Sequence, residues 1–195
     1  MTTATRAKVS YADYAKGEET SDERHEYLDG EVFAMSGGTL EHSALIGAIY
    51  LIIGNQLAAG PCRAFESNAR VRTSQAHGTY ADVTIVCGKV ERDAEDPSSI
   101  VNPTAVVEVL SPTTEKYDRS KKFERYRNLP SFKEYVLVSY EEPRLESHVR
   151  NDDGTWTETF AKAGETLTLR SIDVTIEVNA VYRGLVSDGE KMVLE

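Results

Sequence analysis

Two acidic residues interrupt short runs of β-branched residues, where a buried strand normally carries no charge. Asp82 lies in the segment TYADVTIV and Glu108 in PTAVVEVLSP. Such runs predict strands largely enclosed by protein. An ionised carboxylate there costs on the order of several kcal/mol unless a cation or hydrogen-bond donors offset it. Two such acids favour a divalent-metal site; the alternative is that each is half exposed near a strand end and paired with an arginine.

The alternation of side chains along a strand predicts which residues lie on the same face as each acid. Asp82 should face the same way as Tyr80, and Glu108 the same way as Val106 and Leu110. If the two strands are adjacent, the carboxylates can converge. Hard cations such as Mg²⁺ favour oxygen ligands of this kind. A bound metal can orient a water, lower its pKa and polarise a phosphoryl oxygen.

Length and charge restrict the class of protein. The chain has 195 residues, which suits one domain over residues 1–195. Hydrophobic residues make up 40% and charged residues 28%, as in ordinary folded proteins. The formal net charge of −10 argues against a protein that coats nucleic acid nonspecifically, although it leaves room for a local basic groove.

The cysteines and the apolar segments give an expected location. Cys62 and Cys87 form no zinc-like spacing, and a disulfide framework would need more cysteines, so a reducing cytoplasm is the simplest compartment. The N-terminus has no apolar signal-peptide core. The longest apolar stretch, Ala44 to Ala59, is shorter than a membrane span and contains Gly and Asn. We therefore expect a cytoplasmic protein without membrane contact.

The order of predicted elements indicates a mixed α/β fold. Ser10 and Asp13 resemble a capping box, so a helix should start near Tyr11. Asp29-Gly30 predicts a hairpin turn, and the stretch Leu40 to Ala59 a long, mostly buried helix. Regular β-α alternation, a GxGxxG pattern and a P-loop pattern are all missing from the sequence, which argues against a doubly wound fold. Further strands are expected within 63–73, 78–86, 105–110, 134–139, 143–151, 154–161 and 167–185, with a loop at 90–102, a helix at 115–128 and a short final helix.

The helix that follows Glu108 adds a lysine to the two acids. Asp118, Lys122 and Tyr126 lie on one side of it at i, i+4 spacing. Lys122 borders the predicted buried side, so its amine could help orient a metal-bound water and stabilise charge on a phosphate. The same helix concentrates lysines and arginines that suit a phosphate backbone. Because Glu115 and other acids are interspersed, an ordinary solvated helix face explains the same pattern.

Four segments together resemble the Uma-two family of the PD-(D/E)XK restriction-endonuclease-like superfamily. They are RHEYLDGEVFAMSGGTLEHS, YADVTIV, PTAVVEVLSPTT and DRSKKFERYRNLPSFKEYVLV. The resemblance runs from about Tyr11 to Leu185. It implies a restriction-endonuclease-like core, in which helices flank a mixed β-sheet, with an extra C-terminal β-hairpin in this chain. It also implies a magnesium-dependent phosphodiesterase site.

Carried over by position, the resemblance makes Asp82 and Glu108 the metal-binding catalytic acids and Lys122 the catalytic lysine. Ala81 stands where the family motif has proline. Leu110 occupies the place where the usual E-x-K motif puts its lysine, so the resemblance implies that this role has moved to the following helix. Besides Lys122, the candidates for that role are the lysines at 116 and 121.

Other residues are candidates for supporting roles. Because an early acid often supports metal binding in this superfamily, Glu26 is an auxiliary metal ligand or orients one; pairing with an arginine is the alternative. His42, at the start of the long helix, is either a phosphate contact or a structural histidine. Lys121 and Arg119 are further candidate phosphate contacts.

Two classes of function remain open. The first is a nuclease that uses Mg²⁺, or Mn²⁺ in its place, to hydrolyse phosphodiester bonds, with DNA as the expected substrate. The second is a nucleic-acid-binding module of the same fold with little or no catalysis, which the leucine at 110 and the acidic charge favour; a purely structural protein is a weaker third reading. A homodimer is expected, since symmetric dimers are the commonest oligomers and double-strand cutters of this superfamily commonly pair two sites.

Overall fold

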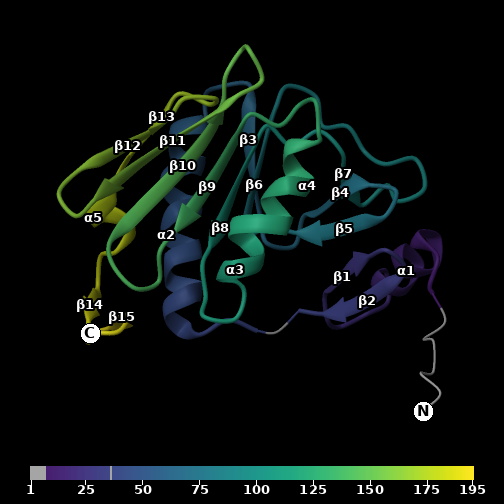
Figure 1. The fold of residues 1–195 in the computed structure, drawn as a ribbon, viewed down its shortest axis with the longest axis horizontal. Helices are drawn as coiled ribbons and strands as arrows, with labels where there is room; N and C mark the ends of the chain where they lie inside the picture. Colours follow the sequence, from purple (N-terminus) through teal and green to yellow (C-terminus); the bar gives the residue numbers. More distant parts are fainter. Residues whose placement is uncertain (1–7, 36) are drawn as a thin grey trace.

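A six-stranded mixed sheet forms the centre of the computed structural model, which describes residues 8–35 and 37–195 (Figure 1). The strand order is β11-β10-β9-β8-β6-β3; β8 and β9 run parallel and the other neighbours antiparallel. This confirms the predicted mixed sheet. It also confirms that the strand after Asp82, β6, is adjacent to the strand that carries Glu108, β8. The strands are β3 Cys62–Glu66, β6 Val83–Cys87, β8 Ala105–Val109, β9 Glu134–Val138, β10 Arg144–Arg150 and β11 Trp156–Lys162.

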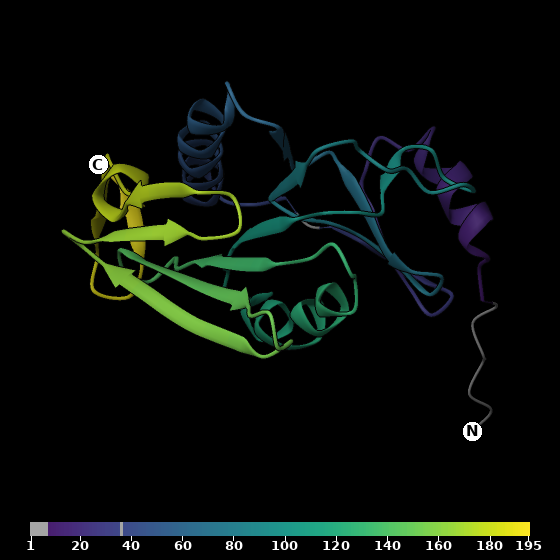
Figure 2. The same ribbon diagram turned by 90° about the horizontal axis from the view of Figure 1, so that it is seen from above.

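Helices cover both faces of this sheet, as Figure 2 shows from above. Side chains of β8 alternate between the two sides: Val107 and Val109 join the core under the long helix, and Val106 and Leu110 join the core on the opposite face. Glu108 therefore points to the second face, as its position in the strand predicts. The long helix is α2, Leu40–Leu57; the opposite face carries α3, Glu115–Tyr117, a π-helical turn η1, Asp118–Lys122, and α4, Phe123–Arg127.

A second sheet lies on the N-terminal side of the molecule, with strand order β2-β1-β5-β4-β7. The predicted capping residue Ser10 accepts a hydrogen bond from the Asp13 amide (3.1 Å) at the start of its helix. The predicted hairpin turn is also confirmed, with positive φ at Asp29 (50°) and Gly30 (89°). The elements are α1 Tyr11–Glu18, β1 His25–Leu28, β2 Glu31–Ala34, β4 Arg70–Ser74, β5 His77–Tyr80 and β7 Ser99–Ile100.

The C-terminal part is richer in strands than expected. Two antiparallel hairpins follow β11 and extend the molecule beyond the six-stranded sheet. The Met192 amide donates to the Tyr140 carbonyl (2.8 Å), which ties the last hairpin to the end of β9. The elements are β12 Thr166–Leu169, β13 Val174–Glu177, α5 Val178–Val181, β14 Leu185–Ser187 and β15 Met192–Leu194.

The prediction that Asp82 lies inside a core strand is wrong. Strand β5 ends at Tyr80 in one sheet and β6 begins at Val83 in the other, so Ala81 and Asp82 form the crossing between the sheets. The two strands read as one run because Thr79, Tyr80 and the residues of β6 all favour strands and neither glycine nor proline separates them. Asp82 is therefore freed from strand pairing, and its side chain retains partial exposure (18%).

The two cysteines also correct an expectation. Cys62 on β3 and Cys87 on β6 are directly opposed in the antiparallel register, and their sulfurs form a disulfide. Separation along the chain gave no sign of this pairing, because the register of β3 against β6 alone brings them together. Paired in this way, the two cysteines do not indicate a reducing compartment. Among the described residues, no helix is both long and apolar enough to cross a membrane.

Candidate active site

The two predicted metal-binding acids open onto one cavity between the sheets. Asp82 Oδ2 accepts a hydrogen bond from the amide of Val109 (2.7 Å), so its carboxylate is fixed one residue from Glu108 on the neighbouring strand. Glu108 is 3% exposed. Both residues line a cavity of about 660 Å³. The crossing between the sheets thus delivers one acid, and the inward face of β8 delivers the other.

Lys122 on the π-helical turn reaches the same point. Its Nζ lies 2.9 Å from Glu108 Oε1 and donates to the Tyr80 carbonyl at 3.1 Å. Two further carboxylates surround the ammonium, since the Oε1 of Glu26 and the Oδ1 of Asp118 each lie 3.8 Å from it. The usual motif pairs the buried acid with a lysine two residues further along the same strand. Here Lys122, from the helix, lies beside Glu108 instead.

Burial and charge act in opposite directions in this cluster. Burial raises the pKa of the Glu108 carboxyl well above its ordinary value, and the Lys122 ammonium partly offsets that rise. Burial also disfavours the charged form of Lys122, but the surrounding carboxylates, with Glu108 first, outweigh it and raise the pKa of the amine. Burial likewise raises the pKa of Asp118. A cation beside Glu108 is therefore strongly favoured.

Glu26 comes from the other sheet. It lies on β1, and its Oε1 accepts a hydrogen bond from the hydroxyl of Thr79 on β5. Its partners in the described structure are this hydroxyl and the more distant ammonium of Lys122, so the expected alternative of an arginine pair is not what the structure contains. Glu26 thus lies at the edge of the acid cluster, where a supporting role in metal binding stays a prediction.

His42 connects the start of α2 to the end of β8. Thr39 caps the helix by accepting a hydrogen bond from the His42 amide (3.2 Å). The imidazole Nε2 donates to the Val109 carbonyl (2.9 Å) and lies 3.8 Å from Asp82 Oδ2. Because the proton on Nε2 is held by a carbonyl, this arrangement favours orientation of the neighbouring carboxylate over contact with a phosphate.

The remaining predicted phosphate contacts lie away from the cavity. Arg119 forms a bidentate pair with Glu146 (2.6 and 3.1 Å) and a further ion pair with Glu115 (2.7 Å). Lys121 is exposed and, like Arg119, does not line the cavity; the same holds for Lys116.

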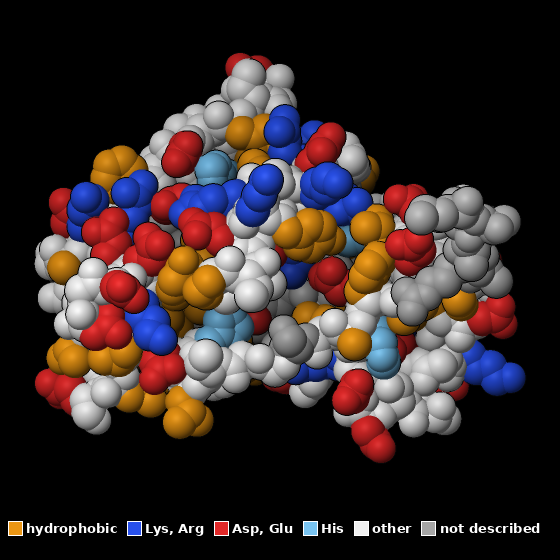
Figure 3. All heavy atoms as spheres, turned by 60° about the horizontal axis from the view of Figure 1, so that its bottom comes forward, with side chains coloured by type: hydrophobic (Ala, Val, Ile, Leu, Met, Phe, Trp, Pro, Cys, Tyr) orange, Lys and Arg blue, Asp and Glu red, His pale blue; other side chains and the backbone are white. Residues whose placement is uncertain are grey.

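The cavity opens on the face of the molecule shown in Figure 3, where the surface is hollowed between the N-terminal hairpin and the rest of the chain. Its wall combines β2 and the residues after it, the first turns of α2, the loop after β8, the π-helical turn and the last hairpin. Acids from both sheets therefore meet at the floor of an accessible hollow.

The sequence assigned no role to two residues that line the cavity, Asp118 and Tyr117. Asp118 was noted for its spacing but not assigned a role, although the i, i+4 relation to Lys122 was the signal for it. Tyr117 lines the cavity, and its hydroxyl lies 3.3 Å from His77 Nε2. Tyr126 is fully buried, with a hydroxyl that has no hydrogen-bond partner among the described residues. Tyr126 follows the i, i+4 spacing and lies behind the cavity, whereas no local pattern marks Tyr117.

The donor set fits a hard divalent cation. Glu108 Oε1 is buried and has charge compensation from Lys122, but within 8–35 and 37–195 no donor points along a hydrogen-bond direction to it. Asp82 Oδ2 is held by a backbone amide, and the carboxylate remains partly exposed to the cavity. Carboxylate oxygens with open lone pairs are the ligands that Mg²⁺ and Mn²⁺ take up, together with waters.

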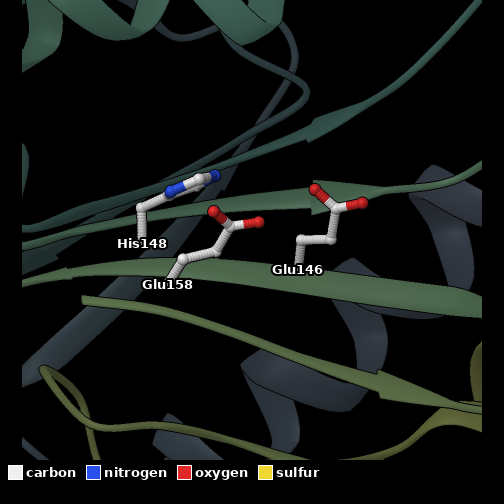
Figure 4. Close-up of side chains that lie close together, drawn as sticks. All are labelled: Glu146, His148 and Glu158. Atoms are coloured by element: carbon white, nitrogen blue, oxygen red, sulfur yellow. The ribbon is translucent and has the colours of Figure 1, made fainter. Parts of the chain in front are cut away.

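A second group of potential metal ligands lies on β10 and β11, away from the cavity. Figure 4 shows Glu146, His148 and Glu158 with their polar atoms turned toward one another. Glu146 already accepts two hydrogen bonds from Arg119, and Arg144 Nε lies 3.0 Å from it. A carboxylate saturated by two guanidinium groups is a poor metal ligand, so we interpret this group as a surface ion-pair network.

Comparison with known proteins assigns the chain to a family. The sequence model of Uma2, described as "Putative restriction endonuclease", matches residues 11–179. The chain belongs to the Uma2 family. The uncharacterized Synechocystis protein slr1290 is 36% identical over 179 residues, which cover 91% of this chain and 93% of that protein. A second uncharacterized Synechocystis protein, sll1609, is 25% identical and covers 80% of this chain and 89% of its own length.

A solved structure confirms the restriction-endonuclease-like fold. It is a crystal structure described as a putative nuclease belonging to DUF820 from Anabaena variabilis. It superposes with a TM-score of 0.69 over 89% of this chain and 97% of its own, at 15% sequence identity. This likeness is one of fold, and the resemblance predicted from the four sequence segments is confirmed by the family match.

Proposed function

We propose that this Uma2 protein is a metal-dependent endonuclease that hydrolyses phosphodiester bonds in DNA. The observation that carries the proposal is the meeting of Asp82, Glu108 and Lys122 at one cavity, with 2.9 Å between the lysine Nζ and Glu108 Oε1. Support also comes from the description of the family as "Putative restriction endonuclease" and of the Anabaena structure as "a putative nuclease".

In this proposal Asp82 and Glu108 hold Mg²⁺, for which Mn²⁺ can substitute, and Glu26 supports the site from the second sheet. The bound metal would supply an acidified water and polarise a phosphoryl oxygen. Lys122 orients the attacking water and stabilises negative charge that builds up on the phosphate in the transition state. His42 donates to the carbonyl of Val109, the residue whose amide holds the Asp82 carboxylate, and thereby fixes this part of the site.

Cleavage of DNA in the presence of Mg²⁺ or Mn²⁺, measured both as nicking of supercoiled plasmid and as cutting of a single-stranded oligonucleotide, tests the proposal. We expect wild-type protein to nick, and Asp82→Ala and Glu108→Ala each to lose on the order of a hundredfold or more in rate, since removal of one strong electrostatic contact costs about that much. Arg92→Ala, a change outside the cavity, serves as the matched purification control.

The alternative, a nucleic-acid-binding module with little catalysis, predicts a different result. Wild-type protein would then bind DNA without nicking it in either Mg²⁺ or Mn²⁺. Titration calorimetry would show no metal binding that depends on Glu108. Absence of both DNA binding and metal binding would remove the nuclease proposal and the alternative together.

A further inference from the structure

Phe33 is an exposed aromatic residue beside the acid cluster. It lies on β2, the edge strand of the N-terminal sheet, and is 45% exposed on the wall of the cavity. In the antiparallel register it is the direct partner of Glu26 on β1. Directly opposed residues point to the same face with adjacent Cβ atoms. The ring therefore lies next to the carboxylate whose Oε1 is 3.8 Å from Lys122 Nζ.

Folding alone does not account for this ring. An apolar side chain this exposed on an edge strand contributes little burial, and edge strands commonly carry charged or polar residues that discourage self-association. The neighbouring positions Glu31 and Ala34 on the same strand are also exposed, so β2 contributes little to the core of the sheet. A ring in this place is suited to contact with a ligand in the cavity.

The charges of the wall do not suit a DNA duplex. A duplex is held mainly by cationic contacts to the phosphates of both strands. Lys122 is enclosed by acids, so Arg24 and Lys191 are the lysine and arginine side chains of the described wall that remain for phosphates. Arg24 is held in place by the Ser67 carbonyl (2.6 Å) and hydroxyl (3.0 Å), which are neutral and leave its charge free. The wall also carries five acids, Glu26, Glu41, Asp82, Glu108 and Asp118.

The dimensions of the cavity lead to the same conclusion. A volume of about 660 Å³ is in the range of sites that enclose one small ligand. A base within a duplex is stacked and cannot enter such a site unless it is extruded, whereas a base in single-stranded nucleic acid is already free. An aromatic ring offers every base a stacking surface without sequence preference.

We propose that the cavity takes unpaired nucleotides, with single-stranded DNA as the substrate class, and that one base next to the cleaved phosphate stacks on Phe33. The inference rests on the proposed function, because it places the phosphate at Asp82 and Glu108. It assigns Phe33 to substrate binding, and it assigns the preference for unpaired strands to the size of the cavity, which accepts a free base but not a stacked duplex.

Fluorescence anisotropy with a labelled single-stranded oligonucleotide, and with the duplex of the same sequence, tests the inference. Both are titrated with protein in Mg²⁺ at one salt concentration, and the same samples are then run on a denaturing gel. The variants are Phe33→Ala, Phe33→Trp and, as the matched control, Phe160→Ala, which removes a 55% exposed phenylalanine on β11 outside the cavity. Thermal melting verifies that each variant is folded.

We expect the single strand to bind more tightly than the duplex, and Phe33→Ala to weaken single-strand binding at least about fivefold, the lower end of what loss of one base stack costs. Phe33→Trp should retain binding, and Phe160→Ala should match wild type. Equal or tighter binding of the duplex, or a Phe33→Ala variant that binds like Phe160→Ala, would overturn the inference.

The gel separates this inference from the proposed catalysis. Single-strand binding that depends on Phe33, with no product in Mg²⁺ or Mn²⁺, leaves the inference standing and removes the nuclease. Rapid cleavage of the duplex by both wild type and Phe33→Ala leaves the nuclease standing and removes the inference.

Discussion

At the scale of single residues, the site depends on a charge balance inside a nearly closed space. Lys122 is 5% exposed and Glu108 3%, so water compensates neither charge. Each needs the other, because an unpaired buried charge costs far more than a paired one. The cluster has more carboxylates than cations, which holds the lysine charged and leaves room for a second cation.

Removal of the lysine charge should therefore destabilise the metal-free protein. We expect Lys122→Met to lower the free energy of unfolding by about 3–5 kcal/mol, the usual cost of an orphaned partner in a buried ion pair. Adding Glu108→Gln should recover most of this loss. Urea denaturation in EDTA measures both, with exposed Lys121→Met as the control; a loss as small as that of the control would show that the pair does not stabilise the fold.

The buried His77 should make the free energy of unfolding depend on pH. Burial lowers the pKa of this histidine from 6.5 to about 3. Between pH 6.5 and pH 3 the histidine is protonated in the unfolded chain but not in the folded one. The contribution of His77 to the free energy of unfolding is therefore fully present above about pH 6.5. It falls toward pH 3 by up to about 1.4 kcal/mol per pH unit. Urea denaturation at several pH values should show a shallower decline for His77→Gln, and parallel curves would contradict the assignment.

At the scale of elements, the site depends on where α2 begins. The helix begins at Leu40, after two glycines and the cap Thr39, and its first-turn histidine reaches the end of β8. A Cβ on Gly38 would lie 2.6 Å from His42 Nδ1, whereas a Cβ on Gly37 would meet nothing within 4 Å. The glycine nearer the helix thus permits the close approach of the imidazole that orients Asp82.

The two glycines form a matched pair for a test. Gly38→Ala should displace the imidazole from the Val109 carbonyl, with a stability cost of about 1–3 kcal/mol, as for other overpacked sites. It should also reduce nicking, whereas Gly37→Ala should stay within about 0.5 kcal/mol of wild type and keep its activity. Thermal melting and the plasmid assay compare them, and equal behaviour of the two variants would contradict the role of His42.

At the scale of the whole molecule, two sheets must be held at a fixed distance for their acids to meet. Asp82 stands on the crossing between the sheets, and Glu26 belongs to the N-terminal sheet alone. The disulfide between Cys62 and Cys87 fixes β3, the edge strand of the central sheet, to β6, which begins just after Asp82. Homodimer formation stays a prediction, which light scattering at micromolar concentration addresses.

Loss of the disulfide should affect stability more than chemistry. The bridge closes a loop with a sequence separation of 25, for which chain entropy predicts about 3.5 kcal/mol of stabilisation. We expect the double variant Cys62→Ser, Cys87→Ser to lose stability of that order in urea denaturation while it still nicks DNA at low temperature. A variant as stable as oxidised wild type would show that the bridge does not constrain the unfolded chain.

The sequence by itself determined the features that depend on local periodicity. Alternation along β8 placed Glu108 on the face opposite Val107, and helical spacing placed Lys122 and Asp118 together on that same side. The hairpin turn at Asp29-Gly30 and the cap of the first helix were equally readable, because each depends on neighbours within four residues.

Only the tertiary structure decided the rest, because it depends on which strands pair and in which register. The sequence could not show that the run around Asp82 divides between two sheets, or that Glu26 from the other sheet would approach Lys122. It could not show that Arg119 would bind Glu146 instead of facing the cavity, or that β3 and β6 would align the cysteines. Pairings between distant segments are fixed by the packing of the whole chain, which no local pattern encodes.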